Sequence, residues 1–340
     1  MPRIDTHRAR IVACAVLTVA GCGERKQDPV PEPTRKPAPE QRPARIGCNP
    51  AAGNVCAGDS VVECTPAGEL GRTLQQCKDG CRQAACIDTC AVHDVELIYV
   101  IDDENHLMSF DPKLLPGDPF HTVGTLVCES PGRPFSMAVD RRGIAWVIYD
   151  SGNLYRVSII DGHCAPSRYE RSGDAPVVFG MGFASDGPKS DRETLFVAAG
   201  DQSHRFARLD TAPDVPELRS LPNLPAKPDH NPELSGTGDG KLFGYFPDNG
   251  LGFVQEIDRT SSRLVGKRWK LRGGTAEVEA YAFAHWGGVF YVFATTDDGI
   301  SQVHSVNRTT GAYKLEIAKL PSRIVGAGVS TCAPLLERVP

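Results

Sequence analysis

The sequence predicts an all-β repeat fold, and a recurring strand end is the first observation that predicts it. A short apolar run closed by aspartate or asparagine occurs five times, at Phe110-Asp111, Ile160-Asp161, Leu209-Asp210, Ile257-Asp258 and Val306-Asn307. Subtracting the residue numbers gives steps of 50, 49, 48 and 49 residues. A unit of this length cannot bury its apolar face alone, so the copies are expected to stack on one another.

The second observation is that each copy consists of short strands separated by turns. In the second copy, 135–140, 144–149 and 154–160 are rich in β-branched and aromatic residues, and Gly and Asp residues separate them. No stretch of this region keeps an apolar period of 3.6 with helix caps, so helices are not expected. Four strands in a repeat of about 40 to 50 residues are typical of a β-propeller blade.

The third observation is that the two ends of the repeat region complete each other. The segment 324–329 has the pattern of an innermost strand, whereas 96–101 and 106–111 have the pattern of second and third strands. Joined, they make one ordinary blade. The sequence therefore predicts a five-bladed β-propeller closed by N- and C-terminal strands, which leaves no open edge.

Two pairs of cysteines lie within or beside the predicted propeller. Cys332 follows the terminal inner strand and Cys90 precedes its expected neighbour, which predicts a disulfide that clips the ring shut. Cys128 and Cys164 pair by elimination, but the pattern places them on opposite rims of neighbouring blades. Because α-carbons more than about 7 Å apart cannot be bridged, either the outer strand before Cys128 is shorter than expected or both thiols are free.

The amino terminus indicates export. Three arginines precede an apolar run at 11–19, which is too short to span a bilayer, and small residues follow. The tetrapeptide Val19-Ala20-Gly21-Cys22 resembles the bacterial lipobox, which implies a signal peptide over 1–21 and diacylation of Cys22. An ordinary secretory signal is the alternative. Gly23, by the same resemblance, implies the outer membrane or cell surface. Residues 22–46 are rich in proline and charge, which predicts a disordered tether.

A cysteine-rich module is expected at 47–90, ahead of the propeller at 91–334. The chain has 12 cysteines. Cys14 leaves with the signal and Cys22 carries lipid, so ten remain for pairing. Six fall in one stretch with little apolar material: Cys48, Cys56, Cys64, Cys77, Cys81 and Cys86. In an oxidising compartment this pattern indicates a disulfide framework whose connectivity stays open. A zinc site of four thiolates at Cys77, Cys81, Cys86 and Cys90 is the alternative, although no histidine lies in the cluster.

Several phrases resemble a recurrent group of bacterial surface lipoproteins in which a six-cysteine module precedes a β-propeller. They are PFSMAVDR at 134–141, FGMGF at 179–183, ELSGTGDG at 233–240, AHWGG at 284–288 and GAGVSTCAP at 326–334. The resemblance implies this architecture and no reaction, because the group has no assigned activity. More distantly, the blade rhythm resembles lactonase-type and kelch-type propellers, although only Gly287-Gly288 supplies the glycine pair of a kelch repeat.

Composition narrows the function. The net charge is −5 and basic residues are spread along the chain, so nucleic acid is not an expected partner. Membrane contact is expected through the lipid alone, and the chain is expected to be a monomer. No Gly-rich phosphate loop, nucleophile elbow or metalloprotease helix motif occurs.

Candidate ligand-binding residues lie on loops that lead into inner strands. They are Asp174, Asp229, His230, Glu233, Glu277 and Glu279. Converging carboxylates and a histidine could perform acid–base chemistry or hold a divalent cation, although solvated loop acids are the plainer explanation. No other cofactor is expected. The acids that recur with the blade, Asp140, Asp161, Asp210 and Asp258, are expected to cap turns.

Two function classes follow. The first is a membrane-anchored, extracytoplasmic binding or scaffolding protein that presents the propeller to a protein or glycan ligand. The second is a funnel-centred hydrolase of lactonase or glycosidase type that uses the loop carboxylates. Propellers host both, so the fold does not choose between them.

Overall fold

The computed structural model describes residues 47–58, 60–77, 81–82, 84–86, 90–173, 175–188, 190–212, 215–227, 231–248, 250–272 and 277–336. The expected signal peptide and tether therefore lie outside the described residues. The chain divides into two units, 1–45 and 46–340, and everything described belongs to the second. Within this part, no helix is long and apolar enough to cross a membrane.

The described secondary structure is all strand apart from two short 3-10 turns, Pro50–Ala52 and Pro112–Leu114, so the all-β prediction is confirmed. The cysteine-rich segment contains a three-stranded sheet and a strand pair. Their strands are β1 (Asn54–Ala57), β2 (Ser60–Cys64), β3 (Leu70–Gln76), β4 (Cys81–Arg82) and β5 (Ala85–Cys86).

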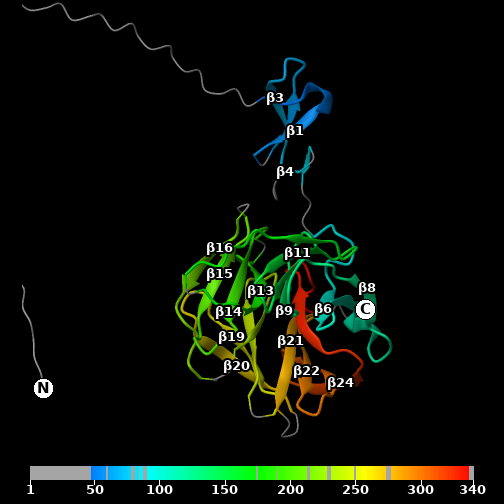
Figure 1. Cartoon of the computed structure of the whole chain (residues 1–340), viewed down its shortest axis with the longest axis vertical. Coiled ribbons are helices and arrows are strands. Elements are labelled where there is room, and N and C mark those ends of the chain that lie inside the picture. Colours follow the sequence, from blue (N-terminus) through cyan, green and yellow to red (C-terminus); the bar gives the residue numbers. More distant parts are fainter. Residues whose placement is uncertain are drawn as a thin grey trace, which may run out of the picture. The chain divides into compact units, whose positions relative to one another are not determined.

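Five four-stranded antiparallel sheets make up the repeat region (Figure 1). Four of them are consecutive in sequence. They consist of β9 (Pro134–Val139), β10 (Ile144–Tyr149), β11 (Leu154–Ser158) and β12 (Cys164–Pro166); β13 (Phe179–Ser185), β14 (Glu193–Ala199), β15 (Phe206–Asp210) and β16 (Glu217–Leu221); β17 (Glu233–Gly236), β18 (Leu242–Phe246), β19 (Phe253–Ile257) and β20 (Leu264–Lys270); and β21 (Val278–Trp286), β22 (Val289–Thr296), β23 (Ser301–Asn307) and β24 (Tyr313–Leu320).

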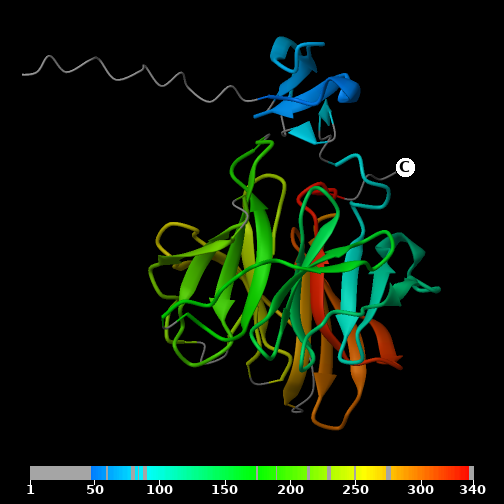
Figure 2. The same ribbon diagram turned by 45° about the horizontal axis from the view of Figure 1, so that its top comes forward.

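The remaining sheet joins both ends of the repeat region. Its order is β25-β6-β7-β8, with the terminal strand β25 (Ile324–Val329) paired to the early strands β6 (Ile98–Asp102), β7 (His106–Phe110) and β8 (Phe120–Thr125). In Figure 2 the red terminal strand lies beside the cyan strand β6, and Ala327 pairs with Val100 in the register. The composite sheet expected from the sequence is thus present.

The first strands of the sheets contact one another in a cyclic order. β9 contacts β13, β13 contacts β17, β17 contacts β21, β21 contacts β25, and β25 contacts β9. Glycines permit this approach: a β-carbon added at Gly328 would lie 2.8 Å from the backbone nitrogen of Val139, and one at Gly182 would lie 2.7 Å from the Leu234 carbonyl oxygen. The inner strands therefore meet backbone to backbone, and the five sheets have a propeller-like arrangement.

Apolar side chains fill the spaces between neighbouring sheets. The buried clusters pair each sheet with the next, and one of them joins β25 and the early strands to β21–β23. In that cluster the rings of Phe110 and Phe293 meet edge to face, with centroids 5.3 Å apart. Burial of such apolar side chains stabilises the fold, because each unit relies on its neighbours to exclude water.

The recurring acids cap turns, as predicted. Asp140 Oδ1 accepts the backbone N–H groups of Arg142 and Ile144 at 2.9 and 3.0 Å. The same two-residue pattern recurs with acceptors and donors at Asp161 and His163, Asp210 and Ala212, Asp258 and Thr260, and Asn307 and Thr309. The repeated acid is therefore a structural part of each sheet.

Cysteine pairing follows the expected framework. Cys90 and Cys332 form a disulfide with α-carbons 5.5 Å apart, and so do Cys128 and Cys164 at 5.4 Å. The second bond is accommodated because β8 ends at Thr125, so Cys128 does not end an outer strand as the pattern indicated.

The cysteine-rich segment contains the disulfides Cys48–Cys64 and Cys56–Cys81, and Cys77 is also disulfide-bonded. The zinc alternative required free thiolates at Cys77, Cys81 and Cys90, which the disulfides remove. Disulfides of this number persist in oxidising compartments, so the protein has an extracytoplasmic location.

Candidate functional site

The predicted loop acids lie in different environments. Asp174, Asp229 and His230 lie outside the described residues. Glu277 and Glu279 are exposed, and Glu279 Oε2 lies 3.6 Å from Arg323 Nη1. Glu233, in contrast, is buried. The described members of the predicted set therefore do not share one solvated pocket.

Glu233 is occupied by protein donors. It begins β17, and its Oε2 accepts the Ser136 hydroxyl at 2.9 Å. The backbone N–H groups of Met181 and Leu234 also donate to this carboxyl. Burial raises the pKa of Glu233 well above its usual range, and these hydrogen bonds oppose the rise. Because its partners belong to the first strands β9 and β13, Glu233 ties three inner strands together.

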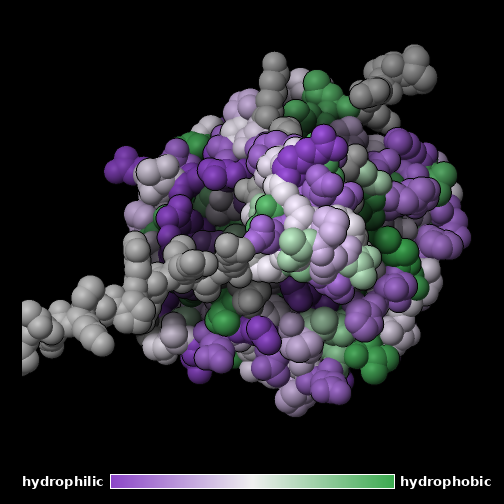
Figure 3. Space-filling view, turned by 90° about the horizontal axis from the view of Figure 1, so that it is seen from above, coloured by the Kyte–Doolittle hydropathy of each residue, from purple (hydrophilic) through white to green (hydrophobic). Residues whose placement is uncertain are grey.

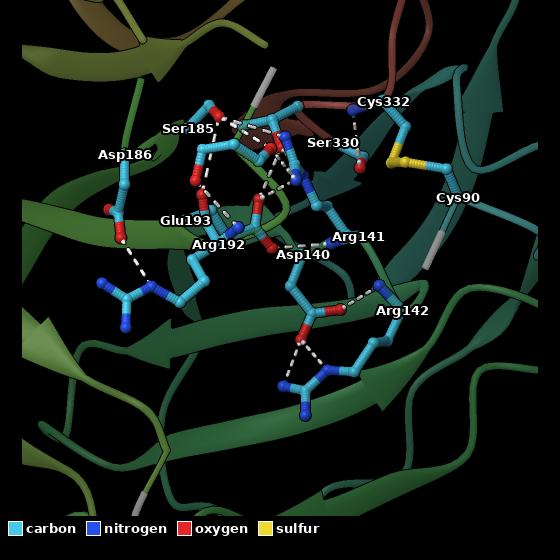
Figure 4. Close-up of polar contacts among 12 residues, drawn as sticks. Cys90, Asp140, Arg141, Arg142, Ser185, Asp186, Arg192, Glu193, Ser330 and Cys332 are labelled. Atoms are coloured by element: carbon cyan, nitrogen blue, oxygen red, sulfur yellow. Dashed lines mark hydrogen bonds and ion pairs between the residues drawn. A yellow bond between two sulfur atoms is a disulfide. The ribbon is translucent and has the colours of Figure 1, made fainter. Parts of the chain in front are cut away.

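A second buried polar cluster lies on the loops that follow the inner strands, and its side chains come from three sheets (Figure 4). Its centre is the guanidinium of Arg141, the second residue after β9. Nε donates to Thr331 Oγ1 at 2.6 Å, Nη1 to the Ser190 carbonyl oxygen at 2.6 Å, and Nη2 to Ser185 Oγ at 3.1 Å. Arg141 therefore connects β9 to the β13–β14 loop and to the segment after β25.

Glu193, the first residue of β14, is the counter-charge. Its Oε1 accepts the backbone N–H of Arg141 at 2.8 Å, and its Oε2 accepts the Thr331 hydroxyl at 2.7 Å and lies 3.8 Å from Arg141 Nε. Burial, aided by the charge of Asp140, raises the pKa of Glu193 to about 7, against the effect of the hydrogen bonds and of Arg141. A carboxyl that titrates near neutrality can exchange a proton, but here both oxygens are held by internal donors.

Glu193 also lines a pocket of about 280 Å³ on the sheet β13–β16. The other charged and hydroxyl side chains in the lining include Asp186, Arg192, Thr194, Arg208, Asp210 and Arg219. Thr194 Oγ1 donates to Asp186 Oδ1 at 2.7 Å, and Arg192 Nε lies 3.6 Å from Asp186 Oδ2. We name this the arginine pocket. The sequence pattern did not indicate it, because most of its residues lie on the strands of one repeat and not on the loops that lead into inner strands.

One group of described residues has side-chain atoms close enough to suggest metal ligands: Asp102, Glu104 and His106, within 4.8 Å of one another. Asp102 Oδ1 accepts the backbone N–H groups of Glu104 and His106 at 3.0 and 2.8 Å, and its Oδ2 lies 2.9 Å from His106 Nδ1. These contacts close the β6–β7 turn, and the hydrogen bond to Asp102 raises the pKa of His106. The turn accounts for the group.

His285 is buried on β21, and its ring stacks on Phe243 at 5.9 Å between centroids. Burial, together with the charge of Arg308, lowers the pKa of His285 to about 3. It is therefore neutral at physiological pH.

Comparison with known proteins gives no family. No family model matches the chain, and no curated protein matches it. The extracellular domain of a hybrid two-component system protein from B. thetaiotaomicron is similar, with a TM-score of 0.35 and 11% identity over 68% of this chain. This chain spans 29% of that protein. A Bacteroides caccae protein of unknown function is similar over 81% of this chain and 97% of its own, with a TM-score of 0.41 and 10% identity.

Proposed function

We propose that this protein is a membrane-anchored, extracytoplasmic binding or scaffolding protein that presents a closed five-bladed β-propeller to a glycan or protein ligand. Five four-stranded sheets with a cyclic order of inner-strand contacts support the propeller. The sheet built from both ends of the chain and the Cys90–Cys332 disulfide support closure.

The observation that favours binding over hydrolysis is the use of two carboxyls, the buried Glu233 and the partly buried Glu193. A catalytic acid or base must reach the substrate directly or through one water. Glu233 is 3% exposed and hydrogen-bonded to Ser136, and both oxygens of Glu193 accept protein hydrogen bonds. Both carboxyls thus serve the internal structure, which leaves the outer surface for ligands.

The character of that surface supports a polar ligand. Hydrophilic residues predominate on the face shown in Figure 3, where hydrophobic residues form small separate groups. Large contiguous apolar patches are the usual mark of an obligate protein interface. A glycan, which offers many hydroxyl groups, suits such a surface.

Binding without turnover is the expected result for the mature protein. We would sediment isolated cell-envelope polysaccharide with the protein and, in parallel, measure hydrolysis of nitrophenyl glycosides and lactones. The protein should be retained with the polysaccharide, with no hydrolysis above buffer. Hydrolysis that Glu233→Gln abolishes would instead establish the hydrolase.

Anchoring is tested separately. If the tetrapeptide ending at Cys22 is a lipobox, Cys22→Ser should move the protein from the membrane fraction to the soluble extracytoplasmic fraction without unfolding it. The tether over 22–46 could then reach roughly 75 Å at about 3.1 Å per residue. Membrane fractionation with a far-UV CD spectrum checks both parts, and an unchanged membrane fraction would rule out the lipid anchor.

A further inference from the structure

The arginine pocket contains two arginines that face each other across neighbouring strands. Arg208 of β15 and Arg219 of β16 are directly opposite in the register, and both line the pocket. Side chains in such positions share a face, with β-carbons about 5 Å apart, and like charges there are destabilising.

Only one of the two is neutralised by its neighbours. Arg219 Nη2 lies 3.3 Å from Asp210 Oδ2 and 3.4 Å from Glu217 Oε2. Across the part of the chain that the structure describes, Arg208 has no ion pair or hydrogen bond, and its side chain is exposed. Arg208 therefore presents an uncompensated charge and its guanidinium donors to the pocket.

The repeats show that strand pairing does not require this arrangement. The position equivalent to Arg208 in β11 is Arg156, which faces Ala165. The equivalent in β19 is Glu256, which, like Arg208, lies two residues before a turn-capping aspartate and faces Val265. Among the described strand pairs of the five sheets, two arginines oppose each other only in the sheet that carries the arginine pocket.

We propose that the arginine pocket binds an acidic sugar unit of a glycan, with the sugar carboxylate on Arg208. This deepens the proposed function and rests on it. A guanidinium presents two parallel N–H donors that match a carboxylate, and a bound anion would relieve the repulsion between Arg208 and Arg219. The Thr194 hydroxyl in the same lining donates its proton to Asp186, and its oxygen can still accept a hydrogen bond from a sugar hydroxyl.

Size and polarity favour a sugar over a peptide. Small-ligand pockets span about 300 to 1,000 Å³, so a pocket of about 280 Å³ suits a group of single-sugar size. Peptides are recognised mainly through strand edges or through apolar grooves. The arginine pocket instead mixes charged donors, carboxylate acceptors and hydroxyls.

Calorimetric titration of the mature protein with D-galacturonate tests the proposal. D-galactose, which has the same ring without the carboxylate, controls for the charge. Sodium sulfate and triglutamate control for a general anion site and for an acidic peptide. We expect saturable binding of galacturonate, at least tenfold weaker binding of galactose, and no competition by sulfate or triglutamate at equal concentration.

Matched substitutions locate the site. Arg208→Gln should weaken galacturonate binding at least tenfold, which corresponds to about 1.4 kcal/mol. Its thermal midpoint should be equal to or above that of the unchanged protein, because the repulsion with Arg219 is removed. Arg156→Gln, at the same position one repeat earlier, should bind galacturonate as before.

Each other outcome overturns the proposal. Galacturonate binding that survives Arg208→Gln places the site elsewhere. Equal competition by sulfate shows a general anion site, and competition by triglutamate shows a peptide site. Absence of galacturonate binding together with retention on envelope polysaccharide rejects this pocket while the proposed function stands. Loss of both rejects the proposed function too.

Discussion

Replacing both Cys90 and Cys332 by serine is expected to lower the free energy of unfolding by about 2 to 5 kcal/mol. The disulfide closes a loop of 242 residues, so its loss frees the unfolded chain over most of the repeat region. The folded repeat region should keep its strands, because β25 still pairs with β6 and buried aromatics still join the neighbouring sheets. Urea unfolding followed by CD and fluorescence measures the change.

The Cys128–Cys164 bond provides the control, because it closes a loop of only 36 residues. The entropy of closing a loop grows with its length. Loss of Cys128–Cys164 should therefore lower the free energy of unfolding by about 1 to 2 kcal/mol less than loss of Cys90–Cys332. A loss below about 1 kcal/mol for the Cys90 and Cys332 pair, or an equal loss for both pairs, would contradict the view that the Cys90–Cys332 bond constrains the whole repeat region.

Glu193 is expected to make the protein more stable at pH 4.5 than at pH 7. Burial raises its pKa in the folded state to about 7 from the usual 4.5, so the folded state binds the proton more tightly than the unfolded state. The stability from this group is complete below pH 4.5 and is lost as the pH rises through 7. A shift of this size is worth about 3 kcal/mol.

The difference between the protein and Glu193→Gln isolates this effect. Buried Glu233 and other titrating groups contribute equally to both proteins, so their pH dependence cancels in the comparison. The difference in the free energy of unfolding between the unchanged protein and Glu193→Gln should change by about 3 kcal/mol between pH 4.5 and 7, to the disadvantage of the unchanged protein. Glu279→Gln, at an exposed strand position, should leave the profile unchanged. A gap that stays constant across this range would mean that Arg141 keeps the Glu193 carboxylate ionised throughout.

The sequence predicted the strand repeat and the joining of both ends because these depend on local periodicity. The period survives even where one strand ends early: β11 ends at Ser158, and Ile160 lies exposed beyond it. Its aspartate still caps the next turn. The paired cysteines could be found because Cys90 and Cys332 flank strands whose adjacency the repeat itself implies.

The functional surfaces depend on contacts that periodicity does not encode. Arg141 and Glu193 are 52 residues apart and meet only because the end of β9 and the start of β14 lie at the same side of neighbouring sheets. The opposition of Arg208 and Arg219 follows from the register of β15 and β16, which a shift of one residue would abolish. Conversely, Glu277 and Glu279 were singled out as loop acids by sequence position, but Glu279 lies in β21. Their exposure and the pairing of Glu279 with Arg323 separate them from Glu233, which is buried.

Disulfide mapping of the unreduced protein tests the closed ring most directly. Cleavage before aspartate isolates Cys90 on residues 88–93 and Cys332 on residues 298–340, each as the only cysteine of its peptide. Mass spectrometry should find these two peptides joined and should separate them after reduction. A bond between Cys90 and any cysteine of the 48–86 segment, with Cys332 free, would contradict the closure of the ring by the two ends of the chain.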